Sequence, residues 1–246
     1  MNLEGKVAII TGAGGGMGSV LTSTLINEGA TLVLIEKELS LFEHLKDMID
    51  GPKTAKLECD LSDINKVEDL ARKLTETYEK VDFLFNVAGI GIYKGIEELS
   101  LKEWQDSVNV NLNAPFVLTK ALLPSLRKSE KGLIVNFGSG MGKFPSAKKI
   151  SYSSSKFGLR GFSLSLSKEL KGTNVDCVLL TLGSVMTNFG TGGIELRKKL
   201  RSEGKKYLEP EQVISKLMEI IKADVREPEY VIYPEGYGEN PQMKVE

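Results

Sequence analysis

The 246-residue sequence predicts an α/β fold: a doubly wound, mostly parallel sheet of seven strands with helices on both faces. Short apolar runs alternate with helical patterns along the chain. Several of these runs are continuously apolar, which is typical of strands covered on both faces. Unbroken strand–helix alternation favours right-handed crossovers within one parallel sheet.

The expected elements follow one another in order. The expected strands, which are rich in apolar residues, are Val7–Thr11, Thr31–Ile35, Ala55–Cys59, Val81–Asn86, Leu133–Phe137, Val175–Leu180 and Tyr230–Tyr233. The expected helices are Met17–Glu28, Ser40–Ile49, Ile64–Tyr78, Leu101–Leu126, Tyr152–Leu170 and Glu211–Lys222. Ser100 and Glu103 form a capping box for the fourth helix. Pro210 suits the first turn of the last helix.

No repeat, low-complexity tract or change of composition marks a second domain, so we interpret residues 1–246 as a single domain. The least regular stretch is Gly183–Glu209. A stretch of that length in a compact domain is typical of a functional lid, and we expect a substrate lid at residues 184–209.

The bulk composition narrows the classes of function. A net charge of −1 gives no reason to expect a nucleic acid or a membrane as partner. The apolar run Val7–Ile10 is too short for a signal sequence, and no run approaches a membrane span, so we expect a cytoplasmic protein. The single histidine, His44, and the cysteines Cys59 and Cys177 form no cluster with metal-ligand spacing, so no metal site is expected.

A glycine-rich loop, Thr11-Gly12-Ala13-Gly14-Gly15-Gly16-Met17-Gly18, joins the first strand to the first helix. Glycines let the backbone approach a pyrophosphate closely, and the helix N-terminus offers free N–H groups to it. Glu36 lies 24 residues past Gly12, close to the offset of a carboxylate that binds the ribose hydroxyls. The alternative is a flexible turn, but this placement favours a Rossmann-like dinucleotide site.

The spacing of Gly12, Gly16 and Gly18 resembles that of the short-chain dehydrogenase/reductase family. The resemblance runs from residue 3 to about residue 187 and includes Asp60, Asn86-Val87-Ala88-Gly89, Asn111, Ser139 and Tyr152-x-x-x-Lys156. It implies an NAD(P)-dependent oxidoreductase that interconverts a carbonyl and a secondary alcohol. One departure is Leu182-Gly183, which stands where the family usually has Pro-Gly.

The predicted chemistry centres on Tyr152. Tyr152 and Lys156 are four residues apart at the start of a helix and share one face. Hydride transfer to a carbonyl creates an alkoxide that needs a proton, and a nearby ammonium favours the phenolate that remains on tyrosine. We therefore expect Tyr152 as general acid/base and Ser139 as hydrogen-bond partner of the reacting oxygen. The resemblance implies that Lys156 also holds the nicotinamide ribose and that Asn111 positions a relay water.

The other predicted site residues contact the dinucleotide or the substrate. The predicted cofactor-binding residues are Gly12, Gly14, Gly15, Gly16, Met17, Gly18, Glu36, Asp60, Leu61, Asn86, Ala88, Gly89, Tyr152, Lys156, Gly183, Val185 and Thr187. The predicted substrate pocket is mostly apolar, which suits an aliphatic or aromatic carbonyl, and consists of Ile90, Ile92, Met141, Phe144 and Phe189.

NAD is the expected cofactor, because Glu36 would repel a 2′-phosphate and because Gly15 stands where many NADP-using relatives carry a basic residue. Lys37 is the counter-evidence, so NADP is the alternative. A carbonyl reductase or alcohol dehydrogenase is the expected enzyme. A catalytically silent, dinucleotide-binding regulatory protein is the alternative function. An epimerase or dehydratase of the longer relatives is disfavoured by the glycine spacing and the short C-terminal region.

Basic residues gather in two segments near the predicted site. They are Lys143, Lys148, Lys149, Arg197, Lys198, Lys199, Arg201, Lys205 and Lys206. One interpretation is a solvated helix face, with Leu196 and Leu200 packed inward. The other is a field that attracts an anionic or carrier-linked substrate, which would favour reduction of a 3-oxoacyl thioester.

The resemblance also bears on disulfides and assembly. In the strand order 3-2-1-4-5-6-7 that it implies, Cys59 and Cys177 lie about 24 Å apart at ~4.8 Å per strand, too far for a disulfide. Relatives pair through their fourth and fifth long helices, where Gly158 and Gly161 would permit close approach. Many tetrameric relatives end in Asp-Gly-Gly, which this chain lacks, so a homodimer is expected and a homotetramer is the alternative.

Overall fold

The computed structural model describes residues 2–236 and confirms the predicted α/β fold. Its seven-stranded sheet is parallel throughout and has the order β3-β2-β1-β4-β5-β6-β7, as the resemblance implied. The strands are β1 Val7–Thr11, β2 Thr31–Glu36, β3 Thr54–Glu58, β4 Phe83–Asn86, β5 Gly132–Phe137, β6 Val175–Leu182 and β7 Glu229–Ile232.

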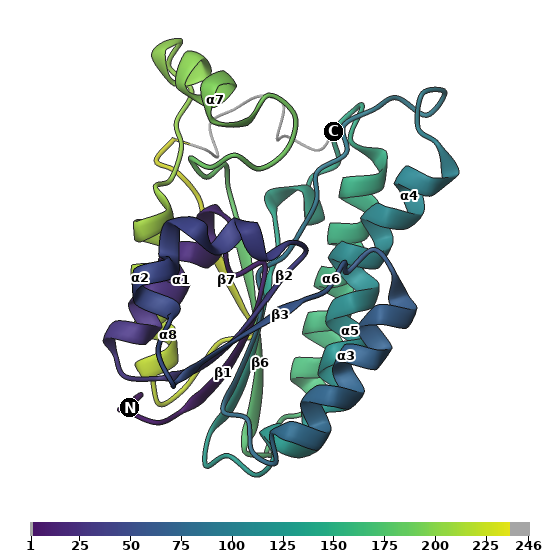
Figure 1. Ribbon diagram of the computed structural model, residues 1–246. Coiled ribbons are helices and arrows are strands. Elements are labelled where there is room, and N and C mark those ends of the chain that lie inside the picture. Colours follow the sequence, from purple (N-terminus) through teal and green to yellow (C-terminus); the bar gives the residue numbers. More distant parts are fainter. Residues whose placement is uncertain (1, 237–246) are drawn as a thin grey trace.

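Helices cover both faces of the sheet, which Figure 1 shows edge-on between them. One face carries α1 Gly16–Asn27, α2 Lys46–Ile49 and α8 Pro210–Lys222. The other face carries α3 Ile64–Thr77, α4 Leu101–Val108, α5 Ala114–Leu126 and α6 Ile150–Glu169. A further helix, α7 Gly193–Ser202, lies beyond the carboxyl ends of the strands. Among residues 2–236, no helix is both long and apolar enough to cross a membrane.

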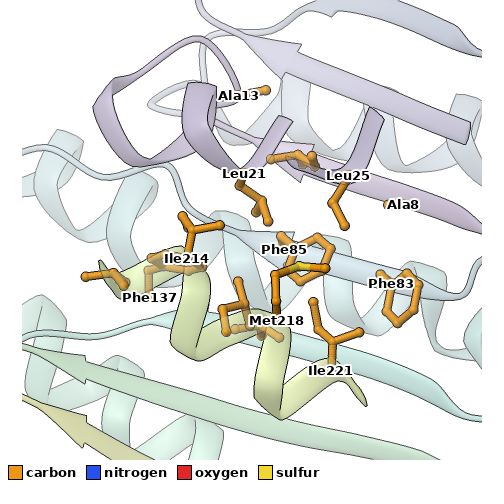
Figure 2. Packing of buried hydrophobic residues seen from close by; sticks show 14 of the residues in the cluster. Ala8, Ala13, Leu21, Leu25, Phe83, Phe85, Phe137, Ile214, Met218 and Ile221 are labelled. Atoms are coloured by element: carbon orange, nitrogen blue, oxygen red, sulfur yellow. The ribbon is translucent and has the colours of Figure 1, made fainter. Parts of the chain in front are cut away.

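Alternating side chains of each strand feed two hydrophobic cores. Phe83 and Phe85 of β4 point toward α1 and α8, where they pack among Leu21, Leu25 and Met218 (Figure 2). Leu84, the residue between the two phenylalanines, belongs to the core on the opposite face. Each fully buried Leu or Phe side chain contributes about 1.5–3 kcal/mol of hydrophobic free energy, so both helix layers are held firmly against the sheet.

Two expected helices have a different form. The continuous helix expected at Leu101–Leu126 is interrupted by a π-helical turn at Asn109–Asn113, between α4 and α5. The helix expected at Ser40–Ile49 is a 3-10 helix over Leu39–Leu45 followed by the short α2. The predicted capping box is confirmed, since Ser100 and Glu103 bond each other's backbone N–H at the start of α4.

The segment between β6 and α8 also departs from expectation. Residues 183–209 were expected to be irregular, but they include α7, whose Leu196 and Leu200 are four residues apart on one side. Gly190, Gly192 and Gly193 lie before or at the start of this helix and all have positive φ. Because glycine is unfavourable in helices, these residues gave no signal in the sequence that a helix begins here. β6 runs to Leu182, which pairs with Ile232, so the residue that replaces the family's proline continues the strand.

The prediction of two unbridged cysteines is confirmed. Cys59 and Cys177 are both free and buried, and Cys59 lies one residue past the end of β3. Burial raises the pKa of Cys59 to about 11 and that of Cys177 to about 12. Both groups therefore stay protonated thiols at neutral pH, which suits inert core residues.

Candidate active site

The glycine loop lies against the chain that follows β4. Gly12 has a φ of +65°, and a Cβ atom there would lie 2.8 Å from the Cα of Ala88. A Cβ on Gly18 would lie 1.9 Å from the carbonyl oxygen of Gly12. Only glycine fits either position. Gly15, the N-cap of α1, places no side chain on the first N–H groups of the helix, which leaves them available to an anionic group.

Glu36 is fixed at the end of β2 beside this loop. Its side chain is buried, and its two carboxylate oxygens accept hydrogen bonds from the backbone N–H groups of Gly14 and Lys37, each at 3.0 Å. The ammonium of Lys37 turns to Asp60 instead, with 3.1 Å between nitrogen and oxygen. A carboxylate thus stands where the sequence places a ribose-binding group, and its basic neighbour is engaged elsewhere.

A groove of about 390 Å³ runs beside the loop, between the ends of β1, β2 and β4. The predicted cofactor residues that line it are Gly12, Gly15, Gly16, Met17, Gly18, Glu36, Asp60, Leu61, Ala88, Gly89 and Thr187. Gly14 is not among the lining residues, and its N–H bonds Glu36. Asn86 is also absent from the lining, and its side-chain amide donates to Asn136 within the sheet at 2.7 Å.

The groove has the features that a dinucleotide requires. It combines a close glycine turn, an uncapped helix N-terminus for a pyrophosphate and a buried carboxylate for ribose hydroxyls. Within residues 2–236, no group of three or more His, Cys, Asp and Glu side chains is arranged to hold a metal ion.

A second cavity, of about 440 Å³, adjoins the groove. The predicted site residues that line it are Met17, Gly89, Ser139, Met141, Phe144, Tyr152, Lys156, Gly183, Val185, Thr187 and Phe189. Two predicted pocket residues lie elsewhere. Ile90 lines the groove, and Ile92 lines neither space, while its carbonyl accepts a bond from Ser151 at 3.3 Å. Tyr93, which sequence reasoning missed, lines the cavity instead.

Tyr152 lies near the start of α6 with its ring enclosed by other aromatic rings. Its ring centroid is 5.8 Å from that of Tyr93, edge to face, and 5.6 Å from that of Phe189. Only 7% of Tyr152 is exposed, so its orientation is set by packing. Such pairs add about 0.5–1.5 kcal/mol beyond the area that they bury.

Lys156 lies one turn further along α6 and is buried. Its Nζ donates a hydrogen bond of 2.7 Å to the carbonyl oxygen of Phe137 and lies 5.8 Å from the centroid of the Tyr152 ring. Burial lowers the pKa of Lys156 to about 8. The side chain therefore remains mostly an ammonium at neutral pH, beside the ring of the proposed acid/base.

Ser139 follows β5 and caps a short 3-10 turn, where its Oγ accepts a bond from the N–H of Met141. The turn packs directly on α6, since a Cβ on Gly142 would lie 2.7 Å from the carbonyl oxygen of Lys156. Gly142 thus brings the serine segment against the helix that carries Tyr152. Sequence reasoning missed this role, although the Gly-Met-Gly pattern after Ser139 was visible.

Asn111 lies in the π-helical turn and is completely buried. Its Oδ1 accepts from the N–H of Ile90 at 2.9 Å, while its Nδ2 donates to the carbonyl of Ile90 and to Ser155 Oγ, both at 3.0 Å. Ser155 in turn donates to the carbonyl of Tyr152 at 2.9 Å. The Asn111 side chain therefore positions the chain after β4 and the start of α6, and its predicted part in a water relay stays a prediction. Single π-helical turns often mark functional sites.

The predicted lid begins against the glycine loop. A Cβ on Gly16 would lie 2.7 Å from Thr187, and one on Gly91 would lie 2.9 Å from the ring of Phe189. Arg197 of α7 donates from Nε to the carbonyl of Thr187 at 2.7 Å and from Nη2 to the carbonyl of Phe189. Arg197 therefore hydrogen-bonds α7 to two residues that line both the groove and the cavity.

Known proteins have sequences similar to that of this chain. The family profile described as short chain dehydrogenase matches residues 6–194. An uncharacterized oxidoreductase of Staphylococcus saprophyticus is 31% identical over 204 residues, which cover 81% of this chain and 87% of that protein. The 3-oxoacyl-[acyl-carrier-protein] reductase of Escherichia coli is 29% identical over 188 residues, which cover 76% of this chain and 77% of that protein.

Solved structures show the same fold. The alcohol dehydrogenase of the archaeon Thermococcus sibiricus, complexed with 5-hydroxy-NADP, is 27% identical with a TM-score of 0.79, covering 93% of this chain and 96% of its own. A 4-hydroxyisoleucine dehydrogenase complexed with NADH is 22% identical with a TM-score of 0.84, covering 96% of this chain and 99% of its own. At that identity, the second likeness supports the fold alone.

Proposed function

Because this chain belongs to the short-chain dehydrogenase family of oxidoreductases, we propose that it interconverts a carbonyl and a secondary alcohol with Tyr152 as general acid/base. One observation carries the proposal: Ser139, Tyr152 and Lys156 line one cavity, and this cavity shares Met17, Gly89, Thr187 and Phe189 with the groove beside the glycine loop. A reacting carbon at this junction would reach both the nicotinamide end of a dinucleotide and the hydroxyl of Tyr152.

The residues of the groove would hold the dinucleotide. The N-terminus of α1 would bind its pyrophosphate, Glu36 would accept bonds from a ribose, and Val185 and Thr187 would lie near the nicotinamide. When bound in its reduced form, it supplies the hydride, with both electrons, to the carbonyl carbon.

The chain itself supplies the proton. Ser139 donates a hydrogen bond to the substrate oxygen, and Tyr152 gives its phenolic proton to that oxygen as the carbon–oxygen double bond becomes single. The ammonium of Lys156, buried 5.8 Å from the Tyr152 ring centroid, stabilises the phenolate that remains. Solvent returns one proton to Tyr152, and alcohol oxidation follows the reverse path.

The relatives do not agree on a substrate. Their names include a 3-oxoacyl-[acyl-carrier-protein] reductase and a D-threitol dehydrogenase, at 29% and 30% identity. A panel of ketones and secondary alcohols, followed through the absorbance of the reduced nicotinamide, therefore tests the proposal directly. We expect turnover of at least one pair. Dinucleotide binding without turnover across the panel would instead favour the silent regulatory protein.

We expect kcat/KM with NADH to exceed that with NADPH by at least tenfold, or about 1.4 kcal/mol. The buried carboxylate of Glu36 would repel a 2′-phosphate, and Lys37 is engaged by Asp60. Glu36→Ser should shift the ratio toward NADPH, whereas Glu38→Ser, an exposed neighbour, should not. Steady-state rates with both cofactors make the comparison, and a tenfold preference of the unchanged chain for NADPH would reverse this assignment.

We propose that two copies pair through α4–α6. This face exposes Phe116 and Phe157, at 47% and 43% of their surface. Gly161 has open space around it, whereas a Cβ on Gly158 would lie 2.7 Å from Leu112 of the same chain, and close approach of two copies at these glycines stays a prediction. Light scattering at micromolar concentration should give at least twice the monomer mass of 27.0 kDa, and Phe157→Glu should lower it. Val225→Glu, at another exposed apolar residue, serves as control, and a monomer mass for the unchanged chain would exclude the pairing.

A further inference from the structure

Six of the nine basic residues near the site fall into two groups of three. Several form ion pairs on the surface: Lys143 with Glu229 at 3.8 Å, Lys198 with Glu195 at 2.8 Å, and Arg201 with Glu209. Three others, Lys149, Arg197 and Lys205, line the 440 Å³ cavity that contains Tyr152. Among residues 2–236, none of these three forms an ion pair, and the cavity lining includes no Asp or Glu.

The three cations converge from two distant segments on a pair of tyrosine rings. Lys149 Nζ lies 5.2 Å from the ring centroid of Tyr93, which itself packs on Tyr152. The guanidinium of Arg197 lies 5.9 Å from the ring centroid of Tyr207, and Lys205 Nζ lies 5.3 Å from the same centroid. Three positive charges therefore lie along the wall of one cavity, and an anion bound among them would offset their mutual repulsion.

The pKa of each of the two lysines is lowered first by burial and then by neighbouring positive charge. Burial, followed by the charges of Lys205 and Arg197, lowers the pKa of Lys149. Burial and the charge of Arg197 likewise lower the pKa of Lys205. A bound carboxylate would oppose the lowering of both pKa values, because an opposite charge favours the charged form of each lysine.

Tyr207 adds an independent sign of a missing ligand. Its side chain lines the same cavity and is 7% exposed, and its hydroxyl is buried without a hydrogen-bond partner within the described part of the chain. A buried hydroxyl without a partner is costly, so such groups usually bond a protein group, water or ligand. Because two cations lie 5.9 and 5.3 Å from the centroid of its ring, the phenolic O–H of Tyr207 is a suitable donor to an anion that they attract.

We propose that Lys149, Arg197, Lys205 and Tyr207 form a subsite for the carboxylate of a small oxo acid, whose ketone is presented to Tyr152. The inference rests on the proposed function, and it names the substrate class. Lys149 precedes Tyr152 by three residues, about one helical turn. The proposed substrate is therefore an oxo acid in which few bonds separate the carboxylate from the ketone carbonyl. The cavity is also near the lower end of the range for ligand pockets and must admit the nicotinamide, which favours a short substrate.

Matched ketones test the charge preference. We expect kcat/KM for acetoacetate or 4-oxopentanoate to exceed that for the methyl ester of the same acid by at least tenfold. Lys149→Gln and Lys205→Gln should each reduce this ratio by at least fivefold. Lys198→Gln, whose lysine is exposed and paired with Glu195, is the matched control and should keep the ratio. Acetoacetyl-coenzyme A should be a poorer substrate than acetoacetate, and the reverse order would overturn the proposal in favour of a carrier-linked substrate.

Binding without turnover separates this proposal from the proposed function. Both acids are titrated calorimetrically into the chain saturated with an oxidised dinucleotide, with which a ketone cannot exchange a hydride, and into the chain alone. We expect the unchanged chain to bind at least one of the acids. Lys149→Gln should bind that acid at least tenfold more weakly than the unchanged chain, and Lys198→Gln should bind it equally well. No binding of either acid, or equal binding by Lys149→Gln, would overturn the subsite. Binding of an acid without turnover of any ketone would leave the subsite standing and count against the proposed reaction.

Discussion

Tyr152→Phe is expected to lower kcat for both carbonyl reduction and alcohol oxidation by a factor of about 10² to 10⁴, the usual contribution of a general acid/base. The variant keeps the ring, and therefore the contacts of 5.8 Å with Tyr93 and 5.6 Å with Phe189. It removes only the hydroxyl that would exchange a proton with the substrate oxygen. Steady-state rates at saturating cofactor and substrate measure the loss.

Dinucleotide affinity should change little, because the groove beside the glycine loop is untouched. Fluorescence titration with the reduced cofactor checks this point. Tyr78→Phe, at the end of α3 and outside both the groove and the cavity, is the matched control and should retain full activity. If Tyr152→Phe reduces kcat by less than about tenfold, Tyr152 is not the acid/base.

Lys156→Met should cause the second-largest loss, about 10²-fold or more in kcat, within the range for one proton-transfer or electrostatic group. Methionine fills similar space in the buried position but cannot donate to the Phe137 carbonyl or stabilise a phenolate on Tyr152. Lys168→Met, at an exposed lysine of the same helix, controls for the loss of a charge from α6. Equal rates for Lys156→Met and the unchanged chain would exclude the assigned role.

The pH dependence gives a sharper signature of Lys156. Burial lowers its pKa to about 8, so the ammonium is present below that pH and is lost as the pH rises through it. Carbonyl reduction by the unchanged chain should therefore fall above pH 8, and Lys156→Met should lack this step. A free lysine titrates near pH ~10.4, so between the two values the unfolded chain binds more protons and rising pH favours folding at this residue. Lys156 itself would therefore not make the chain unfold over the range in which activity falls.

Local patterns in the sequence predicted much of the fold and many of the residues that line the candidate site. Apolar runs marked the inner strands, since strands buried on both faces must be apolar along their length. The edge strands β3 and β7 are only partly buried and were marked by short β-rich runs. The spacing from Gly12 to Gly18 predicted the groove because only glycine allows such close backbone contacts. Tyr152 and Lys156 were predicted to share a face because they are four residues apart in one helix.

Only the tertiary structure decided which side chains of the loops enter the cavity. Tyr93 lines it and Ile92 does not, because the chain after β4 has no regular period and Asn111 sets its course through bonds to Ile90. The sequence by itself likewise determined that basic residues are concentrated near the site. Which of them line the cavity depends on the tertiary placement of the α7 segment and of the start of α6, and such placement of distant segments leaves no local periodicity in the chain.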